Sequence, residues 1–152
     1  MHSLLARLAA TRLDLDEVTS RLTQADVEGA PAPGMRTVGG QLVEIIDTEM
    51  QFLLKLKTGQ GFSMEEGRAR IGDVSSLSVL LASLVSTRAE TVEYIESLFA
   101  EELNEEVTWY AWSGLPTATR ADALASILLH ESYHTGQLVS YLWSRGDDPY
   151  RW

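Results

Sequence analysis

The sequence contains no cysteine. A disulfide framework, a thiolate zinc site and a cysteine nucleophile are therefore excluded, and only histidine and carboxylate side chains are left as metal ligands. Histidine is also scarce, with 3 in 152 residues. Any chemistry that needs imidazole must use this small set of side chains.

Basic residues are few. The chain has 12 Lys and Arg against 22 Asp and Glu, which gives a net charge of −10. Between Ala89 and Thr119 there is no Lys or Arg, while seven glutamates fall in that stretch. Nucleic acids and anionic membranes need a basic surface, so the composition argues against both as partners.

Long hydrophobic runs are missing as well. The N-terminus, "MHSLLARLAATRLDLDEV", mixes leucine with charged residues and offers no cleavage site. It matches neither a signal peptide nor a membrane span. We expect a cytoplasmic protein.

What the sequence does contain is apolar residues at helical spacing, over a length that suits one domain, residues 1–152. One such pattern covers residues 3–25, and a second runs from residue 38 to "TGQGF" at 58–62. A third starts at residue 73 and includes Phe99 on its apolar side. The fourth starts at the weak capping box Thr119-x-x-Asp122 and stops at Gly146. Together they predict an all-α fold, a four-helix bundle.

Two stretches interrupt the helical patterns. Residues 107–116, "VTWYAWSGLP", are rich in β-formers and predict a short irregular or extended link, whose aromatics would cover one end of the bundle or line a pocket mouth. Gly39 and Gly40 lie at the start of the second helix, where glycine is unfavourable. They indicate either a close approach by another backbone segment or a frayed first turn.

The last helix contains His130-Glu131-x-x-His134, the H-E-x-x-H pattern of zinc proteases. Side chains four residues apart on a helix lie about 6 Å from each other, so the two imidazoles could bind one ion. A zinc protease takes its third ligand from downstream, and no Glu or His follows His134. The pattern therefore predicts half of a metal site, completed from upstream, and argues against a protease.

This segment, "HESYHTGQL", resembles the final-helix motif of the DinB/YfiT-like family, small four-helix-bundle metalloproteins, and "TVGGQLVEIIDTE" is similar to the family's second helix. The resemblance implies a divalent metal ion, Zn or Ni, bound by His130, His134 and a residue of the second helix. Glu44 stands where the family usually has its first metal-binding histidine. Two histidines and one carboxylate would leave open positions for water and substrate.

The third ligand has two candidates. At 100° per residue, Glu49 lies in the middle of the apolar stripe of its helix, whereas Glu44 lies to one side. A site on the bundle axis would favour Glu49, and a site in the groove beside the last helix would favour Glu44. His130 and His134 flank the apolar stripe of the last helix, which favours Glu44.

Glu131 also requires an explanation, because it falls on an inward-facing stripe, as do Glu49 and Arg88. An unpaired buried carboxylate is costly. One hypothesis is a buried polar layer of these three residues that sets the helix register. The other makes Glu131 catalytic, either orienting a ligand imidazole or acting as a general base.

Two functions fit the sequence. As the resemblance implies, the protein would be a metal-dependent enzyme that hydrolyses a small-molecule substrate or transfers a low-molecular-weight thiol onto electrophiles in detoxification, a stress response. A thiol co-substrate would supply the nucleophile that a chain without cysteine lacks. The alternative is a non-catalytic bundle without metal that binds a ligand or dimerises. The resemblance implies a homodimer in either case.

Overall fold

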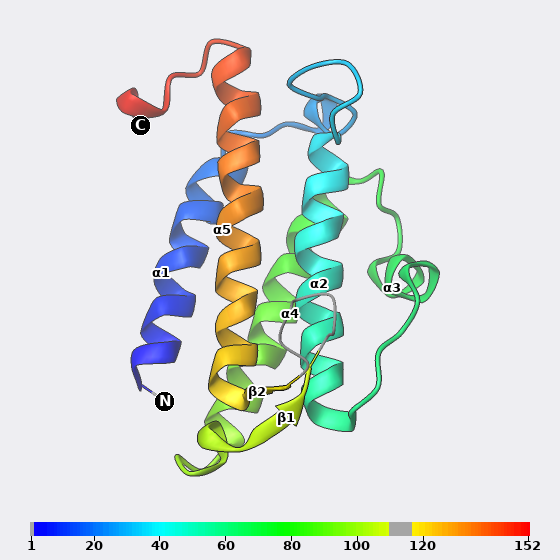
Figure 1. Ribbon diagram of the computed structural model, residues 1–152. Coiled ribbons are helices and arrows are strands. Elements are labelled where there is room, and N and C mark those ends of the chain that lie inside the picture. Colours follow the sequence, from blue (N-terminus) through cyan, green and yellow to red (C-terminus); the bar gives the residue numbers. More distant parts are fainter. Residues whose placement is uncertain (1, 110–116) are drawn as a thin grey trace.

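The computed structural model describes residues 2–109 and 117–152 (Figure 1). Within these ranges the chain is mostly helical, which confirms the all-α prediction. The α-helices are α1 (His2–Thr19), α2 (Val38–Thr58), α3 (Met64–Ile71), α4 (Leu77–Ser97) and α5 (Arg120–Ser144). Short 3-10 turns occupy Gln24–Asp26, Glu102–Asn104 and Pro149–Arg151. Among residues 2–109 and 117–152, none of the helices has the length and hydropathy of a membrane span.

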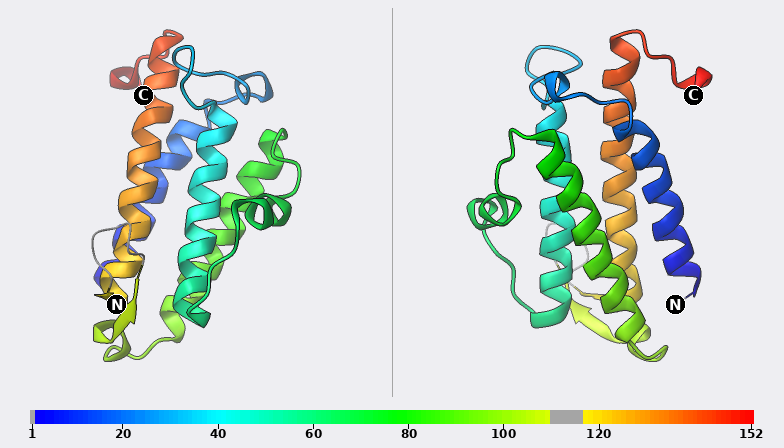
Figure 2. Two further views of the ribbon diagram at one scale, coloured as in Figure 1. Left: turned by 45° about the vertical axis from the view of Figure 1, so that its right-hand side comes forward. Right: turned by 180° about the vertical axis from the view of Figure 1, so that it is seen from behind.

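The four long helices lie side by side, and the views from front and back show the same neighbours (Figures 1 and 2). Helix α5 packs against α1 and α2, and α2 packs in turn against α4. Helix α3 lies outside this group, against α2 and α4. This arrangement places the upper half of α5 directly beside the upper half of α2.

Helix α3 was not predicted from the sequence. It is short and largely polar, with only Gly67 and Ile71 buried. Its N-terminus carries a capping box, in which the Ser63 side chain accepts from the backbone N–H of Glu66 and Glu66 accepts from that of Ser63. Gly67 allows α3 to approach α2, because a Cβ at this position would lie 1.6 Å from Oδ1 of Asp47.

Local signals define the ends of the helices that carry the site. Thr37 caps α2 by accepting from the N–H of Gly40, and Gly59 ends that helix at φ +75°, a conformation that glycine adopts freely. Thr119 caps α5 by accepting from the N–H of Asp122, as its capping-box match predicted. Gly39 marks a close approach, since its N–H donates to the Val27 carbonyl at 2.8 Å.

Two boundaries differ from the predictions. Helix α1 ends at Thr19, and the rest of the predicted 3–25 segment is a turn followed by the 3-10 turn Gln24–Asp26. The placement of Phe99 on the apolar side of the third helix was wrong. Helix α4 ends at Ser97, so Phe99 lies past its end and is 75% exposed.

The core consists of two apolar clusters with charged residues between them. One cluster includes Leu15, Leu42, Ile46, Leu84, Leu138 and Leu142, and the other includes Leu8, Phe52, Ile95, Leu124 and Leu128. On every long helix one buried charged residue lies between the two clusters, namely Arg12, Glu49, Arg88 and Glu131. Each helix therefore contributes one charge to a layer that divides the core.

The link before α5 is extended where it is described. Strand β1 (Glu106–Thr108) pairs antiparallel with β2 (Thr117–Thr119), with Val107 opposite Ala118. The remainder of the predicted 107–116 link, residues 110–116, lies outside the described residues. Trp109 is buried with its ring edge-on to Phe52 at 4.8 Å, so this aromatic side chain covers one end of the helices.

Candidate metal centre

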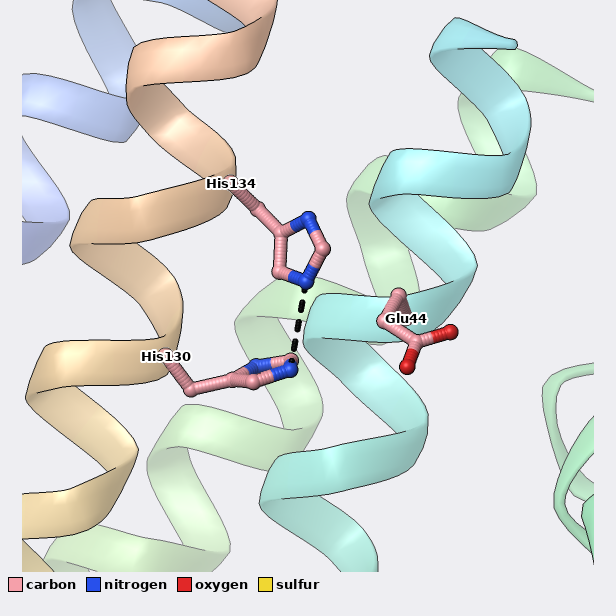
Figure 3. A group of neighbouring side chains, drawn as sticks. All are labelled: Glu44, His130 and His134. Carbon is pink, nitrogen blue, oxygen red and sulfur yellow. Dashed lines mark hydrogen bonds between the residues drawn. The ribbon is translucent and has the colours of Figure 1, made fainter. Parts of the chain in front are cut away.

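Helices α2 and α5 bring three potential metal ligands together. His130 and His134 are one turn apart on α5, and both imidazoles point toward α2, from which Glu44 extends (Figure 3). One ligand atom from each of the three residues lies within 4.8 Å of the other two. The sequence predicted this set, and the structure assembles it in the groove between the two helices.

The spacing of the two imidazoles suits a single ion. Nε2 of His130 lies 3.2 Å from Nε2 of His134. Two nitrogens bound at about 2.0–2.1 Å to one tetrahedral zinc ion lie about 3.3 Å apart. Right-angle coordination at the same bond length gives about 2.9 Å. The observed separation falls between these values, so the donor atoms fit a divalent ion in type and in spacing.

Two glutamines fix the orientation of the His134 ring. Nδ1 of His134 lies 2.5 Å from Oε1 of Gln41 and 2.8 Å from Oε1 of Gln137. Both amide oxygens accept, so Nδ1 must be the protonated nitrogen, and Nε2 keeps its lone pair for a ligand bond. A hydrogen bond from the second ring nitrogen commonly orients a metal-binding histidine in this way. Gln137 belongs to the motif quoted above. Gln41 was missed, although it lies one helical turn before Glu44.

Both histidines are held in their neutral form. Burial lowers the pKa of His130 to about 4, with a further contribution from the neighbouring His134, although Glu44 opposes the shift. Burial also lowers the pKa of His134. An imidazole must be neutral to bind a metal ion, so near neutral pH neither ring has to lose a proton first.

Glu44 has a second partner that the sequence did not indicate. The guanidinium of Arg36, just before α2, forms an ion pair with its carboxylate. The side chain of Arg36 is 46% exposed and that of Glu44 is 32% exposed, so the pair lies at the mouth of the groove. A carboxylate has two oxygens and can contact a cation on each side.

Two cavities open beside the histidines. The first has a volume of about 400 Å³ and borders both histidines; it is lined by Met35, Arg36, Gln41, Glu44, His130, Tyr133, His134 and Gln137. The second, of about 350 Å³, borders only His130 and is lined by Glu44, Asp47, Thr48, Gln51, Phe52, Met64 and His130. Glu44 and His130 belong to both, so a small molecule in either cavity would lie next to the candidate ligands.

Glu49, the alternative third ligand, lies in the core instead. Its Oε1 accepts from Nε of Arg88 at 2.7 Å, and its Oε2 accepts from Arg88 and Arg12 at 3.1 and 3.2 Å. Both oxygens are therefore occupied by arginines. The apolar stripe of α2 points at the core, whereas the histidines lie in the groove, and this explains why Glu44 and not Glu49 is grouped with them.

Glu131 belongs to the same charged layer. Its Oε2 lies 2.7 Å from Nη2 of Arg12 and 2.7 Å from Nη2 of Arg88. The pairing of Glu49, Arg88 and Glu131 is thus as the polar-layer hypothesis predicted. These contacts support a structural role for Glu131, because the arginines hold its carboxylate on the core side of α5. Arg12 was missed, although it lies between Leu8 and Leu15 at helical spacing.

These features define a class: a mostly helical protein with two histidines and one carboxylate gathered between two helices. In a comparison with protein families, the model of the DinB superfamily matches residues 7–138. The chain belongs to the DinB superfamily. Among solved structures, it is similar to a conserved protein of Enterococcus faecalis, with 18% identity and a TM-score of 0.64 over 95% of this chain and 96% of that one. This likeness concerns the fold alone. No curated protein matched the chain.

Proposed function

We propose that the protein is a metal-dependent enzyme built on a four-helix bundle, in which Glu44, His130 and His134 hold one divalent ion. The observation that carries this proposal is the 3.2 Å separation of the two Nε2 atoms, with a Glu44 oxygen in the same group. Without an ion, the two Nε2 atoms are joined by a hydrogen bond, in which the N–H of His130 can donate to the lone pair of His134 (Figure 3). Loss of the His130 Nε2 proton to the other ring nitrogen would turn both Nε2 lone pairs toward one shared cation.

When bound, a divalent ion would supply Lewis-acid chemistry that activates water or a low-molecular-weight thiol. The protein's own residues would do the rest. Gln41 and Gln137 hold the proton on Nδ1 of His134 and fix the ring. The cavity of about 400 Å³ beside both histidines would take a small-molecule substrate. Because the chain has no cysteine, a thiol nucleophile would have to come from a co-substrate.

The cavity could hold a substrate for either reaction, hydrolysis or thiol transfer. Tyr133 and Met35 form part of its lining and give it an apolar side, while Arg36 and Gln137 add polar groups. Such a mixed lining suits a small organic molecule with one polar group directed at the ion. Glu131, held by two arginines on the core side of α5, would keep the helices in register rather than take part in the reaction.

One observation favours the alternative, a metal-free bundle that binds a ligand or dimerises. Arg36 already neutralises Glu44 without any ion. A protein that had lost its metal could keep the carboxylate in this way. The two hypotheses therefore differ in what happens to the Arg36 to Glu44 pair when divalent metal is supplied.

Metal content of the purified protein separates them. Elemental analysis after incubation with zinc or nickel and extensive dialysis should give one ion per chain for the wild type. The variants Glu44→Ala and His134→Ala should each lose it. Glu93→Ala, which removes an exposed carboxylate of α4, is the control for binding to the acidic surface and should keep full stoichiometry. A wild type that takes up no metal under these conditions sinks the enzyme proposal.

A further inference from the structure

Arg36 is held at the candidate metal centre by more than its ion pair. The aliphatic part of its side chain lies over the first turn of α2, where Gly40 leaves room. A Cβ at position 40 would lie only 2.7 Å from Cγ of Arg36. The unfavourable glycine at the start of α2 thus makes space for this arginine. Its guanidinium then lines the cavity of about 400 Å³ that also borders His130 and His134.

A bound divalent ion would make the net charge beside this cavity positive. Without an ion, the charges of Arg36 and Glu44 cancel. A divalent ion on Glu44 and the two histidines would leave an excess of two positive charges beside the cavity, one from the ion and its carboxylate together and one from Arg36. On a chain with a net charge of −10, this would be a local positive site.

Resting on the function proposed above, we propose that Arg36 binds a carboxylate group of the substrate or co-substrate when the ion is in place. The guanidinium already pairs with a carboxylate, that of Glu44, and its planar fork matches this group. Once the carboxylate of Glu44 binds the ion, its negative charge no longer neutralises Arg36. A carboxylate of the ligand would then neutralise the positive charge of the guanidinium. The Arg36 side chain is 46% exposed, and it lines the cavity as well as pairing with Glu44.

The ligand class that follows is a small organic acid, or a thiol that carries a carboxylate. Tyr133, with its exposed ring 5.0 Å from that of His134, and Met35 would contact its apolar part. The carboxylate would lie at Arg36, and the reactive group would face the ion. Arg36 would then set specificity and position the ligand without touching the reacting atoms.

The test uses cobalt(II)-loaded protein, whose absorption reports on a thiol that binds the ion, titrated with mercaptoacetate and with neutral mercaptoacetamide. The wild type should bind mercaptoacetate, and Arg36→Gln should bind it about 10- to 100-fold more weakly while keeping one cobalt per chain. Arg36→Lys, which keeps the charge but loses the fork, should fall in between. Mercaptoacetamide should bind the wild type and Arg36→Gln alike.

The matched control is Arg68→Gln, which removes an arginine from a neighbouring cavity that Arg36 also lines but the histidines do not. It should change mercaptoacetate affinity less than 2-fold. Equal mercaptoacetate affinity in wild type and Arg36→Gln, or an equal loss in Arg68→Gln, overturns the inference although cobalt is bound. Loss of cobalt in Arg36→Gln alone would show that Arg36 only positions Glu44, and it also overturns the inference. Absence of cobalt from the wild type overturns the proposed function itself.

Discussion

Replacing Arg88 by methionine should show how much the buried charged layer contributes to the stability of the fold. Arg88 donates to Glu49 at 2.7 and 3.1 Å, to Glu131 at 2.7 Å and to the Leu8 carbonyl at 2.9 Å. Methionine fills much of the same space but makes none of these bonds. Two carboxylates that are 2% and 1% exposed would then face the single guanidinium of Arg12. One buried negative charge would remain without compensation.

Breaking a buried ion pair in this way costs about 3–5 kcal/mol of unfolding free energy. Domains of this kind are commonly stable by only about 5–15 kcal/mol, so the loss is a large fraction of the total. For a chain of 152 residues it corresponds to a fall in Tm on the order of 10 °C. Urea denaturation followed by circular dichroism at 222 nm would measure it.

The loss should depend on pH in a definite direction. Burial raises the pKa of Glu131, and Arg12 and Arg88 partly oppose the shift. Without Arg88 its pKa rises further, so the folded variant takes up a proton more readily than the unfolded chain. A group with a raised pKa favours the folded state at low pH and loses that contribution as the pH rises through the folded value. The deficit of Arg88→Met should therefore be smaller at pH 5 than at pH 7.5.

Two further variants test whether an unpaired buried charge causes the loss of stability. Arg7→Met, an exposed arginine of α1, should change stability by less than about 0.5 kcal/mol. Replacing all four charges of the layer by Met and Leu should restore much of the loss, because no charge is then left unpaired. A deficit below about 1 kcal/mol for Arg88→Met, or one that is the same at both pH values, would show that no uncompensated charge is left in the core of the variant.

Two predictions concern other parts of the chain. Burial alone would raise the pKa of Asp26, yet hydrogen bonds from Tyr141, Arg145 and Thr23 hold this pKa well below its usual range. Asp26→Asn should therefore lower the free energy of unfolding by about 2–3 kcal/mol at pH 7, and by progressively less below pH 4, where the wild-type carboxylate also becomes less stabilising. Denaturant titrations would measure the loss, and a loss that is unchanged at pH 3 would contradict this prediction. Because the pKa of His130 is lowered to about 4, the zinc affinity should stay nearly constant from pH 7 to 5.5. A site built from histidines of ordinary pKa would instead lose affinity from pH 6.5 downward. Competition with a chelator of known pH dependence would measure the affinity.

The parts of the structure that depend on local sequence could be predicted. Thr37 and Thr119 cap α2 and α5 through their own side chains, and Gly59 stops α2, so the positions of these helices follow from neighbouring residues. The pairing of His130 with His134 is likewise a property of one helix. Four residues of spacing bring both rings to the same face whatever the rest of the chain does.

Which residue supplies the third ligand depends on how α2 and α5 are rotated relative to each other. Glu44 and Glu49 are both on α2, and the sequence alone offered only the angle of each to its apolar stripe. The structure turns that stripe onto the core, where Glu49 meets Arg12 and Arg88, and this leaves Glu44 facing α5. Arg36 precedes the helix, so no helical periodicity could indicate its contact with Glu44.

Two other omissions had signals in the sequence. Arg12 follows Leu8 by four residues and precedes Leu15 by three, so it lies on the buried stripe of α1 and could have been added to the polar layer. The Ser63-x-x-Glu66 capping box marks the start of α3. Helix α3 buries too little apolar surface to produce a clear pattern, and its position depends on the contact between Gly67 and Asp47.

Anomalous X-ray diffraction from crystals of the zinc-loaded protein would show whether Glu44, His130 and His134 bind one divalent ion. The prediction is a single strong anomalous peak about 2.0–2.2 Å from Nε2 of each histidine and from a carboxylate oxygen of Glu44. A map with no peak between α2 and α5, or with zinc bound elsewhere while Arg36 still pairs with Glu44, would contradict it.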